Sequence, residues 1–154
     1  MSHKKAVSQV QFEISQIDRL LDSYSNLLEK SRNSEPDLVE LTALASVLHS
    51  FYNGVENIFL TIAKRIDNNL PDRKHWHRDL LIQMSTVTSN RYRVISGESK
   101  LQLAEYLAFR HFYRHSYSFF LSWDEMDKLV NDLRTVWGAV KSDLNNFACT
   151  IPKE

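Results

Sequence analysis

Apolar positions along the chain recur at spacings of three and four residues, the period of helices that bury one face. A first helix is predicted over residues 6–28, whose stripe comprises Val10, Ile14, Ile17, Leu21, Tyr24 and Leu28. Polar residues 31–36 interrupt the pattern, and a broader stripe predicts a long second helix over residues 37–67. Three further helices are predicted over residues 75–86, 100–120 and 123–147. The pattern therefore predicts an all-α fold, a compact up-and-down bundle of about five helices.

The composition agrees with this fold class and indicates the cellular surroundings. The 154 residues suffice for a single domain over 1–154 with loose tails at 1–5 and 150–154, and only 3 glycines and 3 prolines disfavour a fold of many short strands. The single cysteine, Cys149, excludes an intramolecular disulfide and fits a reducing cytosol. The sequence lacks a signal-peptide core and any run of the roughly 18 apolar residues that a membrane helix needs. We therefore expect a cytoplasmic protein with no membrane partner.

Basic residues are unevenly distributed along a chain whose formal net charge is +0. Residues 72–115 contain eight Lys and Arg against four Asp and Glu, together with four of the six histidines. The rest of the chain carries the compensating excess of acids. A basic, histidine-rich zone on a neutral protein indicates a confined anion site, and a chance cluster on a solvated face is the alternative.

The predicted helix 100–120 carries charged residues inside two apolar stripes. One stripe consists of Leu103, Tyr106, Arg110, Tyr113, Tyr117 and Phe120, and the other of Leu101, Ala104, Ala108, Phe112, His115 and Phe119. Both stripes should be covered, by the bundle or by a partner chain, so that Arg110 must meet an acid or an anion. On such a helix Arg110, Arg114 and Tyr117 share a face, whereas His115 lies about 140° around from Arg110.

Two interpretations of these residues remain open. In the first, Arg110 is a core residue paired with Glu56, and His115 is bonded to a backbone carbonyl. In the second, both take part in RNA cleavage without metal, because a histidine can move a proton near neutral pH and an arginine can stabilise charge that develops on phosphate. Phe112 and Tyr113 would then offer flat surfaces to bases.

The segment Arg110-x4-His115-x-Tyr117 resembles the RX4HXY motif of the HepT-like toxins of the HEPN superfamily. Residues 51–59 and 76–81 resemble the second and the short third helix of that family, and residues 109–112 and 121–123 also fit. The resemblance covers about residues 48–130. It implies a HEPN-like helical bundle that forms a homodimer and places two RX4H segments around a shared cleft.

The resemblance also implies a function. HepT-like toxins are metal-independent endoribonucleases without a cofactor, and tRNA is the leading expectation for the RNA that is cleaved. Carried over to this chain, Arg110 and His115 are catalytic at the dimer cleft. A cognate MntA-like nucleotidyltransferase antitoxin adds AMP to Tyr117, which blocks the RNA site. Five further residues are expected to support substrate binding: His111, Arg114, Tyr113, Glu56 and His77.

One position departs from the family pattern. His111 stands where many members have Asn or Asp after the arginine, which leaves proton transfer open between His111 and His115. The i, i+4 spacing of these two histidines also fits a zinc ion, but no third ligand is evident, so we expect no metal. Two alternative functions remain: a non-catalytic HEPN-like module that binds a nucleotidyltransferase or nucleotides, and a purely structural dimerisation bundle.

Overall fold

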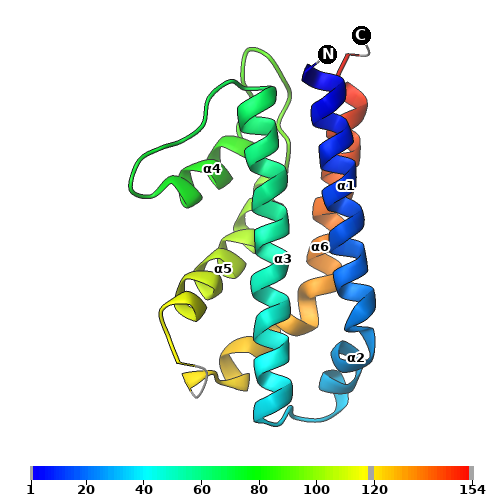
Figure 1. Ribbon diagram of the computed structural model, residues 1–154, viewed down its shortest axis with the longest axis vertical. Coiled ribbons are helices and arrows are strands. Elements are labelled where there is room, and N and C mark those ends of the chain that lie inside the picture. Colours follow the sequence, from blue (N-terminus) through cyan, green and yellow to red (C-terminus); the bar gives the residue numbers. More distant parts are fainter. Residues whose placement is uncertain (1, 118–119, 153–154) are drawn as a thin grey trace.

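The computed structural model describes residues 2–117 and 120–152, and within them the chain forms six α-helices. These are α1 (Ser2–Ser23), α2 (Ser25–Asn33), α3 (Leu38–Arg65), α4 (Trp76–Met84), α5 (Gly97–Arg114) and α6 (Trp123–Thr150). The central helix is α3, with α1 and α6 on one side and α4 and α5 on the other (Figure 1). Successive long helices run in opposite directions, so the predicted all-α, up-and-down bundle is confirmed.

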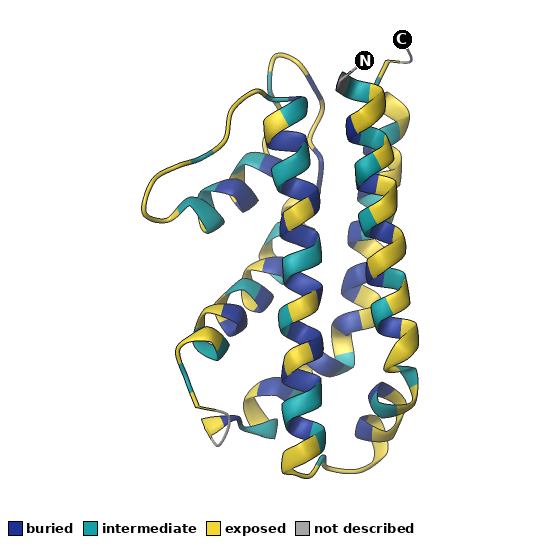
Figure 2. Ribbon diagram, in the orientation of Figure 1, coloured by how far each residue is buried: buried dark blue, intermediate teal, exposed yellow. Residues whose placement is uncertain are grey.

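The core surrounds α3 and takes buried residues from all six helices, and α1 turns its exposed positions outward (Figure 2). The predicted stripe of the first helix is buried at Val10, Ile14, Ile17 and Leu21, each worth about 1.5–3 kcal/mol when fully removed from water. Gly54 permits the close approach of α1 to α3, because a Cβ atom there would lie 2.8 Å from Cγ1 of Ile17. Asp37 caps α3 by accepting from the amide of Glu40 at 2.8 Å, and the Glu40 carboxylate accepts from the amide of Asp37 at 3.1 Å.

Three predicted boundaries near the termini are wrong. The helix predicted over residues 6–28 is divided at Tyr24, where the backbone turns so that α2 packs Leu28 into the core. Residues 2–5, predicted as a loose tail, form the first turn of α1, because the fully buried Ala6 anchors that turn. At the other end Thr150 closes α6 and Ile151 packs against the core; residues 153–154 of the predicted tail lie outside the described residues.

A buried ion pair holds the two loops on either side of α4. Asp67, just after α3, accepts from Nε and Nη2 of Arg91 at 2.6 and 2.8 Å. Arg91 also donates to the backbone carbonyls of Gln83, Thr86 and Tyr92. Arg91 thereby fixes the segment after α4 to the end of α3, which determines where α4 lies against the bundle.

The helix predicted over residues 100–120 begins at Gly97 and ends at Arg114. His115 is the C-cap, with φ −115° and ψ 9°, and its amide bonds to the carbonyl of Phe112. The shorter helix has a geometric cause, because the chain must reverse direction before α6 begins at Trp123, and antiparallel helices need several connecting residues. Tyr117 therefore does not share a helical face with Arg110, and the expected 140° relation of His115 does not apply. Phe119 of the second predicted stripe lies outside the described residues.

The two stripes predicted for this helix differ in burial. Leu103, Tyr106 and Arg110 of the first stripe are buried against the bundle. On the second stripe Leu101 is 67% exposed, and Ala104 and Ala108 are exposed as well. In the single chain the bundle therefore covers the first stripe only, and cover of the second stripe by a partner chain stays a prediction.

Candidate active site

A groove with a cavity volume of about 610 Å³ lies between α4 and α5. Eight of its twelve lining residues are basic or histidine, and none is acidic: Lys74, His75, His77, Arg78, Arg110, His111, Arg114 and His115. The remaining lining is apolar: Leu81, Ala104, Leu107 and Ala108. Four of the eight Lys and Arg of residues 72–115, and all four histidines of that zone, thus line one concave surface, called the basic groove below.

Glu56 on α3 joins the two walls of the basic groove. Its Oε1 atom accepts from Nη1 of Arg110 on α5 at 3.0 Å, and its Oε2 atom accepts from Nδ1 of His77 on α4 at 2.7 Å. Nη1 of Arg110 is also 3.5 Å from Nδ1 of His77. Since Nδ1 cannot both donate to the carboxylate and accept from the guanidinium, the short contact to Glu56 decides that Nδ1 carries the proton.

Arg110 is almost fully buried, with 7% of its surface exposed. Its guanidinium carbon lies 5.9 Å from the centre of the Tyr52 ring, and its Nε atom has no hydrogen-bond partner among the described residues. Burial and the charge of Glu56 raise the pKa of the Tyr52 hydroxyl, which stays neutral beneath the guanidinium. The expected Arg110–Glu56 pair is therefore confirmed, and the same arginine also lines the basic groove.

His111, Arg114 and His115 gather at the C-terminal end of α5, on one wall of the groove. All three are exposed, and the rings of His111 and His115 lie 4.7 Å apart. His115 is thus not a core histidine held by a backbone carbonyl, and that part of the first interpretation is wrong.

Three predicted site residues do not line the groove: Glu56, Tyr113 and Tyr117. Tyr113 packs toward α3, with its ring 5.1 Å from His49 and 6.1 Å from Phe109. Tyr117 follows the end of α5 and is 72% exposed. Burial lowers the pKa of His49 beside Tyr113, and the charges of Arg110 and Arg114 add to this effect.

Lys74, His75 and Arg78 line the groove but were not among the residues predicted for the site. Their sequence signal was the local excess of positive charge and of histidine over residues 72–115. Trp76 stacks on the neighbouring His77 with ring centres 3.6 Å apart, and so helps to fix the plane of that imidazole.

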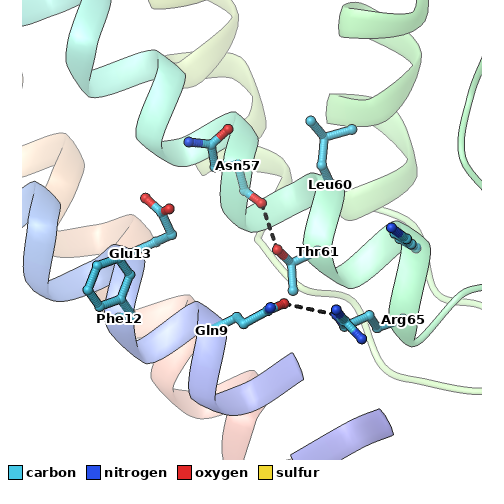
Figure 3. A pocket seen from close by; sticks show the side chains of 8 residues that line it. Gln9, Phe12, Glu13, Asn57, Leu60, Thr61 and Arg65 are labelled. Carbon is cyan, nitrogen blue, oxygen red and sulfur yellow. Dashed lines mark hydrogen bonds between the residues drawn. The ribbon is translucent and has the colours of Figure 1, made fainter. Parts of the chain in front are cut away.

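A second groove, with a cavity volume of about 450 Å³, lies between α1 and α3 (Figure 3). Arg65 donates from Nε to Gln9 across it at 2.9 Å, and Phe12 is exposed at its edge. Its lining contains one acid and two bases but no histidine. Across the part of the chain that the structure describes, no three His, Cys, Asp or Glu side chains gather as a metal site would require. The basic groove is therefore the stronger candidate for chemistry.

Comparisons with known proteins identify the family of the chain. The family model for HepT-like proteins matches residues 43–151, which include every residue of the basic groove and Glu56. Comparison with curated proteins finds no significant match, and neither does comparison with solved structures. None of the helices among the described residues is both long and apolar enough to cross a membrane.

Proposed function

The chain belongs to the HepT-like proteins of the HEPN superfamily, and from this premise we propose that it is the toxin of a HEPN/MNT toxin–antitoxin pair. In this proposal it is a cytoplasmic, metal-independent endoribonuclease whose substrate is RNA. We propose tRNA as the leading candidate for that RNA. The observation that carries the proposal is the basic groove, in which Arg110 and four histidines surround a space without any acidic lining residue.

The chemistry follows from the charges around the groove. Lys74, Arg78 and Arg114 are exposed cations that attract the phosphates of an RNA strand. Arg110, held in place by Glu56, stabilises the additional negative charge on the phosphate that is cleaved. His115, assisted by His111, transfers a proton to or from a reacting oxygen.

A homodimer fits the uncovered side of α5. Leu101, Ala104 and Ala108 are exposed along this helix, and the two alanines lie in the groove wall. We propose that a second copy packs here and brings two RX4H segments to one cleft. Small side chains allow two helices to approach closely, and burying Leu101 removes an exposed apolar residue from water.

Replacing Leu101 with aspartate is expected to convert the dimer to a monomer and to reduce RNA cleavage by at least about tenfold, because a charge would be buried in the contact. Light scattering after size-exclusion chromatography measures the mass. The matched control is Val39→Asp, which places the same charge on an aliphatic position that is 77% exposed at the start of α3. A Leu101→Asp protein that remains dimeric contradicts the proposed contact.

Tyr117 is the proposed acceptor of AMP from the cognate MntA-like nucleotidyltransferase. Its exposure of 72%, just beyond the groove, leaves the side chain accessible to a second enzyme. Incubation with that nucleotidyltransferase and ATP is expected to add AMP to Tyr117 and to abolish cleavage, because phosphate and bulk would enter a site that binds phosphate. Peptide mass spectrometry measures the addition. The Tyr117→Phe variant should take up no AMP, and modification at another residue would disprove this assignment.

Sequencing of RNA ends from cells that express the protein tests the proposed activity. New ends are expected with the wild type, and cleavage by purified protein is expected to persist in EDTA. No new ends, together with tight binding of the nucleotidyltransferase, would favour the non-catalytic module instead. Strict dependence on an added metal ion would favour the zinc hypothesis for His111 and His115.

A further inference from the structure

We propose that His77 is a second catalytic histidine, the general base for the RNA 2′-hydroxyl, on the wall of the basic groove opposite His115. This inference rests on the proposed function, since it assigns a reacting group within the same site. Motif spacing does not predict it, because His77 lies 33 residues before Arg110 and meets it only through the fold.

The contacts of His77 determine which of its nitrogens can react. Nδ1 donates to Oε2 of Glu56 at 2.7 Å, so in the neutral ring Nε2 carries the lone pair. The Glu56 carboxylate fixes this tautomer through its bond to Nδ1. It also stabilises the imidazolium that forms when Nε2 takes a proton. The side chain is 31% exposed and lines the groove, so the imidazole is accessible to a substrate.

The position of His77 places this base beside the charge that binds phosphate. Nη1 of Arg110 is 3.5 Å from Nδ1 of His77, and both side chains donate to the same carboxylate. A phosphate held by Arg110 therefore lies next to the His77 ring. Stacking of Trp76 on that ring at 3.6 Å restricts its rotation.

The two walls of the groove supply the two proton transfers that RNA cleavage needs. The O2′ atom bonds to phosphorus while its proton passes to Nε2 of His77 on α4. The bond between phosphorus and O5′ breaks, and the leaving O5′ takes a proton from the imidazolium of His115 on α5. The products are a 2′,3′-cyclic phosphate and a 5′-hydroxyl. Attack and departure occur on opposite sides of phosphorus, which fits a base and an acid on facing walls.

The test replaces His77 with asparagine, whose side-chain amide can still donate to Glu56 but cannot accept a proton. With total cellular RNA as the probe, cleavage is expected to fall by about 100-fold or more, while KM changes by less than about threefold. The acidic limb of the kcat–pH profile should disappear. Several titratable or charged groups surround His77 and are retained in this variant: Glu56 of α3, Arg110, His111 and Arg114 of α5, and Lys74, His75 and Arg78 beside α4.

A modified substrate separates a base from an acid. An RNA spanning the mapped cut, with sulfur in place of the leaving O5′, needs no proton on its leaving group. It should restore cleavage by His115→Ala but not by His77→Asn. The control His49→Asn removes a half-buried histidine that packs on Tyr113 outside the groove, and it should keep the wild-type rate.

The outcomes distinguish this inference from the proposed function. If the wild type cleaves RNA and a folded His77→Asn protein keeps both its rate and its acidic limb, His77 is not the base and the endoribonuclease proposal stands. Rescue of His77→Asn by the sulfur substrate would likewise overturn the assignment as base. If the wild type produces no RNA ends, the proposed function fails, and this inference fails with it.

Discussion

Replacing Arg110 with alanine is expected to lower RNA cleavage by at least about 100-fold and to reduce the stability of the fold as well. The loss of activity follows from removing a fixed positive charge where the phosphate gains negative charge. The loss of stability follows from burial, because Arg110 is only 7% exposed and pairs with Glu56 at 3.0 Å. Removing its side chain leaves a buried carboxylate with His77 as its remaining side-chain partner. Breaking a buried pair in this way costs about 3 kcal/mol.

Circular dichroism and single-turnover kinetics measure these two effects separately. For a chain of this size, about 3 kcal/mol lowers Tm by about 6–12 °C, which defines a temperature at which the variant is still folded. The variant Arg110→Lys keeps the charge but loses the planar fork, so it should retain more stability than alanine while cleaving RNA more slowly than the wild type. A folded Arg110→Ala protein that cleaves within about threefold of the wild-type rate would exclude Arg110 from catalysis.

The sequence predicts this site unevenly, and the reasons are physical. Arg110 lies within an apolar stripe, so an acid or an anion was expected beside it, and Glu56 is that acid. The contact of His77 with the same carboxylate was not predicted, because it depends on where α4 lies. That position is determined by long loops and the Asp67–Arg91 pair, which helical periodicity does not encode.

The end of α5 illustrates a second limit of the sequence pattern. Aromatic residues continue the apolar stripe to Phe120, and periodicity alone therefore extends the helix to that residue. The helix ends at Arg114 because the chain must turn to begin α6, a requirement of topology rather than of local propensity. The sequence pattern likewise does not predict the direction of a side chain. Tyr113 was expected to support substrate binding, yet it packs on His49 and does not line the groove.

The charge distribution, by contrast, was informative without any knowledge of topology. The excess of bases over residues 72–115 predicted an anion site, and this window contains both walls of the basic groove. Lys74 lies in the turn before α4 and Arg78 lies on α4, whereas Arg114 ends α5. A charge excess over a window does not depend on which residues are in contact. This explains why the window includes residues of both walls, whereas the RX4HXY motif includes only residues of α5 and the segment that follows it.

Replacing His115 with alanine is expected to abolish growth arrest in cells and to leave the stability of the fold nearly unchanged. This contrast with Arg110 follows from position: His115 is exposed at the C-cap of α5, where truncation of a side chain alters stability by less than about 0.5 kcal/mol. Loss of a proton-transfer group lowers the rate by about 100-fold or more. Growth curves, RNA-end sequencing and thermal melting of the same variant measure all three quantities.

The neighbouring His111→Ala variant is the matched control, because it removes an exposed histidine of the same helix end, whose ring is 4.7 Å away. We expect it to retain measurable cleavage, since the RX4H spacing selects His115 for proton transfer and leaves His111 to orient it or the phosphate. The reverse result, with His115→Ala toxic and His111→Ala inactive, would transfer the acid role to His111 while keeping the basic groove as the site. Full toxicity of both variants would show that neither His111 nor His115 takes part in cleavage. That result would also contradict the proposed acid and base on facing walls of the groove.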